Sequence, residues 1–92
     1  MNNNQTKDIS IIIVSWNVSD LLQRALRSIE ESLKCSENMG HFVSVETIVI
    51  DNASGDGSAD LVHSLFPHVK LIANNINKGF GAANNQGLKI AA

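Results

Sequence analysis

Three short apolar runs along the chain alternate with longer segments of helical character. The runs cover residues 9–14, 45–50 and 69–73 and are rich in the β-branched residues that strands prefer. Residues 19–34 and 58–66 place apolar side chains three or four positions apart, and residues 80–92 are rich in small side chains that let a helix lie close to a sheet. This alternation predicts parallel strands joined by crossover helices.

A polar cluster follows each apolar run. The clusters are residues 15–17, 51–54 and 74–79. Parallel strands end at a common edge, and the ligands of such sheets bind just beyond that edge. The sequence therefore predicts a three-layer α/β/α domain with a mainly parallel sheet and one binding edge made of the three clusters.

Local signals mark where these elements begin and end. Ser19 and Ser58 stand where hydroxyl side chains commonly cap helices, and a loop at residues 35–44, centred on Gly40, separates the first helix from the second strand. The β-branched run at residues 9–14, broken only by Ser10, is typical of a strand buried on both faces.

Composition narrows the class of protein without indicating a function. The 92 residues suffice for one small domain, and 43% apolar with 17% charged residues is ordinary for a globular protein. A net charge of -2 gives no long-range attraction to nucleic acid, so we expect no nucleic-acid partner. The single cysteine, Cys35, excludes an intrachain disulfide, and the sequence shows no signal peptide, so we expect a cytoplasmic protein.

Known ligand motifs fit this chain poorly. A calcium loop aligned on Asn52, Ser54 and Asp56 would need a bidentate glutamate at its twelfth position, where His63 stands. A dinucleotide fold should carry a glycine-rich turn after the first strand, but residues 15–19 contain no glycine. A nucleotide-sized ligand is therefore indicated only by the topology.

Each of several residues at the predicted edge suits either contact with a ligand or a purely structural role. Asp51 would accept hydrogen bonds from a base or a ribose, or it caps its own turn, which is the commoner role of aspartate. Asn74 and Asn77 carry donors and acceptors that suit a base edge, but asparagine also tolerates left-handed turns. Lys78 would meet a phosphate or stay solvated, and Trp16 is expected in the core and not as a stacking surface.

Three segments together resemble the start of the family 2 glycosyltransferases. They read IIIVSWN at residues 11–17, VIDNASGDGS at residues 49–58 and NNINKGFGAANNQG at residues 74–87. Within that family they are most similar to the rhamnosyltransferase-like bacterial enzymes that build cell-surface polysaccharides. Three motifs in this order make the resemblance specific, and it covers nearly the whole chain.

The resemblance implies a GT-A fold whose Rossmann-like half binds a UDP- or dTDP-sugar, in an inverting enzyme with a saccharide or lipid-linked acceptor. In that fold Asp51 would read the pyrimidine base, Asn52 would shape its loop, and Asn85 would brace the site from the third helix. The full set of nucleotide-sugar-binding residues that the resemblance implies is Val14, Ser15, Asn17, Asp51, Asn52, Asn74, Asn77, Lys78, Gly79 and Asn85.

The chain departs from the family pattern in its acidic residues. The family binds Mg²⁺ or Mn²⁺ and the sugar diphosphate through an Asp-x-Asp cluster and supplies an aspartate as general base, but this sequence contains no Asp-x-Asp. Departure of a diphosphate needs a metal or basic residues to neutralise its charge. We therefore expect an N-terminal piece that is inactive by itself, with residues 1–8 as a disordered polar terminus and residues 9–92 as the nucleotide-sugar-binding part.

Other interpretations stay open at this point. One is a non-catalytic α/β binding or assembly module, and another is a flavodoxin-like or receiver-like domain, which the lack of an acidic pair after the first strand disfavours. Related folds place a further strand beside the first one, so an open β-branched edge predicts homodimerisation, element exchange or aggregation. For a full-length enzyme, peripheral association with a membrane is a further expectation.

Overall fold

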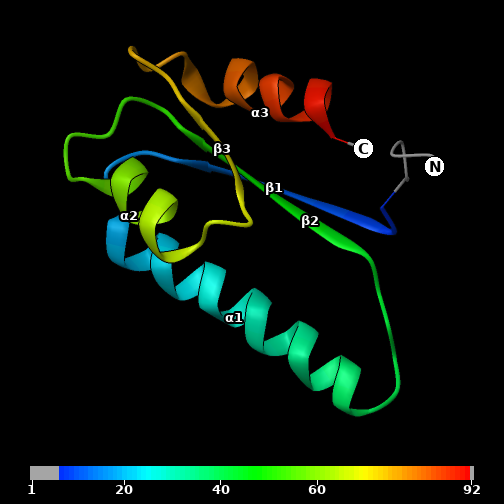
Figure 1. Ribbon diagram of the computed structural model, residues 1–92. Coiled ribbons are helices and arrows are strands. Elements are labelled where there is room, and N and C mark those ends of the chain that lie inside the picture. The colour runs from blue at the N-terminus through cyan, green and yellow to red at the C-terminus, as the bar shows by residue number, and fades with distance from the viewer. Residues whose placement is uncertain (1–6, 92) are drawn as a thin grey trace.

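The computed structural model describes residues 7–91, which form a three-stranded parallel sheet with helices on both faces (Figure 1). The strands lie in the order β1-β2-β3, and Ser15, Asp51 and Ala73 are in register at their carboxyl ends. This arrangement confirms the predicted α/β fold with a parallel sheet. In chain order the elements are β1 (Ile9–Ser15), α1 (Ser19–Asn38), β2 (Val45–Asp51), α2 (Ser58–Leu65), β3 (Lys70–Ala73) and α3 (Gly79–Ile90).

The core has two halves because successive side chains of a strand point to opposite faces of the sheet. The half on one face joins β2 to α1 and to the α2 region and contains Leu22, Leu26, Val49, Val62 and Phe66. The half on the other face joins β2 to α3 and contains Ile48, Ile50 and Ala83. β2 is thus the central strand of the domain, and it carries Asp51 at its end.

α3 lies close to the sheet because small residues face it. Ala83 is fully buried, and a Cβ atom built on Gly87 would lie 2.7 Å from Ile12 Cγ2 and 2.9 Å from Ile50 Cδ1. Both distances are well inside van der Waals contact, so only glycine fits at this point of the helix without moving its neighbours. The close approach predicted from the small residues of the third helix is confirmed.

β1 differs from the prediction of a strand buried on both faces. It lies at the edge of the sheet and, among residues 7–91, pairs only with β2. Residues 10–14 are half-buried. The outer edge of β1 therefore presents unpaired N–H and C=O groups, and self-association through this edge stays a prediction.

α1 continues further than the apolar spacing predicted. It extends to Asn38, so Cys35 lies in the helix and is exposed. Gly40, at a φ of 83°, adopts the left-handed conformation that commonly ends a helix, and the connection to β2 is shorter than predicted. Neither α1 nor any other helix within residues 7–91 is long and apolar enough to cross a membrane.

The segment before β1 is described only in part. Residues 1–6, on which most of the predicted disorder falls, lie outside the described residues. Asp8 belongs to the fold, because its Oδ2 atom accepts a hydrogen bond from the Ser44 N–H at 2.8 Å.

Candidate functional site

The three polar clusters meet at the carboxyl edge of the sheet. The Asn52 N–H donates to the Ser15 carbonyl at 2.8 Å, and the Asn74 N–H donates to the Asp51 carbonyl at 2.8 Å. These bonds continue the ladder of the sheet one residue beyond the strands. Residues far apart in the sequence are thereby held side by side, at the edge where parallel sheets bind their ligands (Figure 1).

Asp51 and Ser15 carry buried polar atoms that lack a hydrogen-bond partner within residues 7–91. The atoms are Asp51 Oδ1 and Ser15 Oγ, on residues that are 3% and 2% exposed. The other carboxylate oxygen, Asp51 Oδ2, accepts the Ser54 N–H at 3.1 Å. Asp51 thus caps its own turn through one oxygen, and the other oxygen has no partner among the described residues. A buried polar atom without a partner costs about 1–3 kcal/mol, and a ligand that bonds to it would remove that cost.

Asn17 joins the loop after β1 to the loop after β2. Its Oδ1 atom accepts the Gly55 N–H at 2.7 Å, and its own N–H donates to Ser54 Oγ at 2.9 Å. Asn17 and Ala53 both have positive φ angles, of 52° and 67°. Asparagine adopts this conformation readily, whereas alanine pays about 1–2 kcal/mol for it. The Asn17 side chain therefore shapes the site from within the chain.

The helix capping predicted for Ser19 and Ser58 is made by Asp56 instead. Asp56 Oδ2 accepts the Ser19 N–H at 3.1 Å, which places this carboxylate at the N-terminus of α1. Asp56 Oδ1 accepts the Ser58 N–H at 3.1 Å and also the Ser58 hydroxyl, at the N-terminus of α2. One negative charge thus stabilises two helix N-termini, where the helix dipoles favour it. Sequence reasoning missed this role because Asp56 is remote from Ser19 in the chain.

The role of Asp56 predicts a pH dependence of stability. The hydrogen bond from the Ser58 hydroxyl, followed by those from the Ser19 and Ser58 N–H groups, lowers the pKa of Asp56 below its ordinary value of 3.8. A carboxyl whose pKa is lower in the folded chain contributes stability above the unfolded pKa, and this contribution is lost as the pH falls through the folded pKa. We expect the difference in unfolding free energy between wild type and Asp56→Asn to be constant above about pH 5 and to shrink below pH 3.8.

Urea unfolding at a series of pH values measures this difference. Glu31→Gln, which replaces an exposed carboxylate on α1, is the matched control and should follow the wild-type curve. A stability difference for Asp56→Asn that stays constant down to about pH 2 would contradict the capping role.

Asn52 connects the end of β2 to the loop after β3. It is 2% exposed, and its Oδ1 atom accepts the Lys78 N–H at 3.0 Å and the Asn74 side-chain amide at 3.1 Å. Its Nδ2 atom donates to the Gly79 carbonyl at 3.2 Å. Asn77 Oδ1 accepts the Gly79 N–H at 2.8 Å, and Gly79 itself has a φ of 80° that favours glycine. These bonds leave the side chain of Lys78 exposed at the edge.

The side chain of α3 that bonds to the loop after β3 is Gln86 and not the expected Asn85. Asn85 is exposed and makes no side-chain hydrogen bond within the part of the chain that the structure describes. Asn74 Nδ2 donates to Gln86 Oε1 at 2.8 Å, and Gln86 Nε2 donates to Asn74 Oδ1 at 2.9 Å. Asn74 Nδ2 also donates to Asn52, so both N–H groups of this side-chain amide are used within the chain. Asn74 thus shapes the site and has no free donor to offer a base.

The positions of Val14 and Trp16 relative to the core differ from those that the sequence predicts. Val14, expected to touch the nucleotide, packs into the half of the core that faces α3. Trp16, expected in the core, is 54% exposed. The cause is strand alternation: Val14 is in register with the buried Ile50, whereas Trp16 lies beyond the last paired residue, Ser15.

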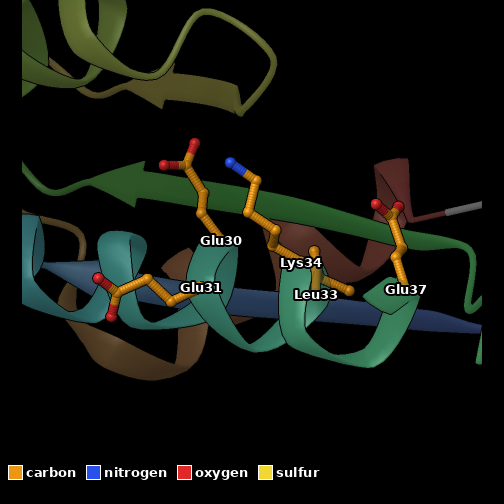
Figure 2. Close-up of a pocket in the computed structure, with 5 residues that line it drawn as sticks. All are labelled: Glu30, Glu31, Leu33, Lys34 and Glu37. Atoms are coloured by element: carbon orange, nitrogen blue, oxygen red, sulfur yellow. The ribbon is translucent and has the colours of Figure 1, made fainter. Parts of the chain in front are cut away.

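Three hollows on the surface of residues 7–91 lie away from the strand-end edge. One of about 430 Å³ lies on α1 and is shown in Figure 2. Three carboxylates and one ammonium group border it, and such a surface would repel a diphosphate. Its lining residues are Glu30, Glu31, Leu33, Lys34 and Glu37. Two further hollows, of about 280 and 330 Å³, border the amino-terminal ends of the strands.

The described part of the chain offers no cluster of side chains suited to a divalent cation. Within residues 7–91, no group of three or more His, Cys, Asp or Glu side chains is placed to hold a metal ion. Both oxygens of Asp56 serve the helix N-termini, and Asp51 offers a single unpaired oxygen. We therefore derive no metal-dependent step from these residues.

Comparison with known proteins gives two matches. Residues 10–92 match the family described as glycosyl transferase family 2. The chain is also similar to the succinoglycan biosynthesis protein ExoO of Rhizobium meliloti (strain 1021), with 34% identity over 85 residues. The aligned part covers 91% of this chain and 22% of that relative, so the chain spans about a fifth of the relative's length.

Proposed function

Because the chain belongs to glycosyl transferase family 2, we propose that its strand-end edge binds the nucleotide of a nucleotide-diphospho-sugar donor. The observation that carries this proposal is the buried, unpartnered Asp51 Oδ1 atom beside the unpartnered Ser15 hydroxyl. A carboxylate oxygen accepts the ring N–H of uracil or thymine, and a hydroxyl beside it donates to a carbonyl of the same ring or bonds to the ribose. Binding would thus satisfy two atoms that residues 7–91 leave unpaired.

Two exposed side chains support the same proposal. Trp16, 54% exposed next to Ser15, offers an indole face on which a base can stack, a contact worth about 1–3 kcal/mol. Lys78 is exposed on the loop after β3, where its ammonium group can approach a phosphate, and Asn77 shapes the turn next to it. In this proposal Asn17, Asn52 and Asn74 hold the loops in place and do not contact the base.

The wider proposal concerns the whole enzyme and comes from the family. We propose inverting transfer of a hexosyl or rhamnosyl unit to a saccharide or lipid-linked acceptor, in polysaccharide synthesis of the kind that the name of ExoO indicates. Because the sequence lacks an Asp-x-Asp cluster, we further propose that the 92-residue chain binds its donor without transferring the sugar. Release of free sugar or a glycosylated product by the purified chain would contradict this last point.

Replacement of Asp51 tests donor binding. The chain is titrated with UDP-glucose, dTDP-glucose and GDP-mannose, and binding is followed by the fluorescence of Trp16 and by backbone amide shifts. Hydrogen bonds to a charged group contribute about 1.5–3 kcal/mol, so Asp51→Asn should weaken binding by about 10- to 150-fold. Asparagine keeps an oxygen for the Ser54 N–H, so the turn should persist.

Asp60→Asn, on the exposed side of α2, is the matched control and should bind like wild type. If no nucleotide sugar shifts the amides of Ser15 and Asp51, or if Asp51→Asn binds as tightly as wild type, the donor-site proposal is wrong. The non-catalytic assembly module would then be the better interpretation.

A further inference from the structure

Gln86 ties α3 back to the beginning of the loop that leads into this helix. It lies about two turns into α3, and its amide forms the reciprocal pair with Asn74, the first residue after β3. Both bonds of the pair, at 2.8 and 2.9 Å, are part-buried. The loop of residues 74–78 is therefore closed at its base by a side chain that lies outside the loop.

The pair and Asn52 together fix which way the Asn74 amide points. Asn74 Oδ1 receives the Gln86 Nε2–H, so Asn74 Nδ2 is directed toward Gln86 Oε1 and Asn52 Oδ1. The reversed amide would set Asn74 Nδ2 against Gln86 Nε2 and Asn74 Oδ1 against Asn52 Oδ1, leaving donors facing donors and acceptors facing acceptors. Asn52 Oδ1 in turn accepts the Lys78 N–H. A chain of amides thus runs from Gln86 through Asn74 and Asn52 to the backbone of Lys78.

Few contacts other than this chain of amides hold the loop of residues 74–78. Residues 75–78 are exposed, and Ile76 keeps 67% of its surface accessible, so no apolar side chain anchors the loop in the core. The loop is held at its first residue by the Asn74 N–H bond to the Asp51 carbonyl and at its last by Asn52. Its shape therefore depends on the amide chain more than on apolar packing.

We propose that Gln86 is a positioning residue for the loop of residues 74–78, which it holds in the shape that presents Lys78 to the donor diphosphate. Gln86 acts through Asn74 and Asn52 and does not contact the donor. The effect on the loop is independent of the proposed function, and only the effect on donor affinity rests on it.

The first test needs no ligand. Amide hydrogen exchange is measured at Lys78 in wild type and in Gln86→Met, which keeps the side-chain length and removes the hydrogen bonds. Loss of one buried hydrogen bond corresponds to about a tenfold change in an opening equilibrium, so we expect about tenfold faster exchange at Lys78. Asn85→Ala, on the same helix but outside the amide chain, should leave this rate unchanged.

A double variant separates a positioning role from general loosening of the helix. If Gln86 acts through Asn52, then Gln86→Met should not accelerate exchange at Lys78 any further in an Asn52→Ala chain, because the chain of amides is already broken. Additive effects of the two substitutions, or unchanged exchange at Lys78 in Gln86→Met alone, would overturn the proposal.

The second test measures affinity for whichever of UDP-glucose, dTDP-glucose and GDP-mannose binds the wild type. Gln86→Met should weaken binding by about three- to tenfold, with amide shifts at Lys78 reduced and those at Ser15 retained. Unchanged affinity together with faster exchange at Lys78 would overturn the link to the donor. If none of the three compounds binds the wild type, the donor-site proposal fails, and the exchange experiment alone decides the role of Gln86 in the loop.

Discussion

Gly87→Leu is expected to lower the free energy of unfolding by about 3 kcal/mol, because overpacking a filled core typically costs about 1–3 kcal/mol and this site lies at the upper end. A Cβ atom alone would already approach Ile12 Cγ2 to 2.7 Å and Ile50 Cδ1 to 2.9 Å. A leucine adds three more carbon atoms in the same direction. α3 must then move away from the sheet, which opens the half of the core formed by Ile48, Ile50 and Ala83.

Chemical unfolding of the variant, followed by circular dichroism, measures this loss. The matched control is Gly81→Ala on the same helix, since a Cβ atom at Gly81 meets nothing within 4 Å. Alanine favours a helix over glycine by about 1 kcal/mol, so this control should be as stable as wild type or more stable. Equal stability of Gly87→Leu and wild type would show that α3 does not lie against the sheet as described.

Asn52→Ala is the second substitution for which we expect a large effect, a loss of about 2–4 kcal/mol in the free energy of unfolding. The variant removes three hydrogen bonds at a residue that is 2% exposed: those from the Lys78 N–H and the Asn74 amide, and that to the Gly79 carbonyl. Each such bond contributes about 1 kcal/mol, and buried groups that lose their partners add to the cost. The loop after β3 should also exchange its amides faster.

Asn75→Ala serves as the control for Asn52→Ala, because Asn75 is an exposed asparagine in the same loop. Its unfolding free energy should stay within about 0.5 kcal/mol of wild type, as is usual for surface substitutions. If Asn52→Ala is no less stable than Asn75→Ala, the network around Asn52 contributes nothing to the fold.

The order and type of the main elements follow from the sequence because they depend on local pattern. The runs before Ser15 and Asp51 are β-branched and apolar, and each polar cluster stands where a strand must end. Parallel strands share one carboxyl edge, so the sequence also predicts that Ser15, Asp51 and Asn74 lie close together. Element ends are less certain from pattern alone, as the added turn of α1 before Gly40 shows.

The partner of each polar side chain does not follow from the sequence, because partners are chosen across loops that local pattern does not describe. Asp56 bonds to Ser19, and Gln86 bonds to Asn74, through approaches that depend on how the helices pack. The face on which a residue lies also depends on the last paired position of its strand, so Val14 packs against the core and Trp16 is exposed.

The sequence by itself determined the alternating fold, the common strand-end edge and the family, since periodicity and motif spacing are properties of the chain. Only the tertiary structure decided that Asp51 keeps one buried oxygen without a partner among residues 7–91, while its other oxygen and the neighbouring asparagines are bonded within the chain. The physical reason is that each donor or acceptor serves a limited number of partners. Folding therefore determines which polar atoms are already paired and which remain for a ligand.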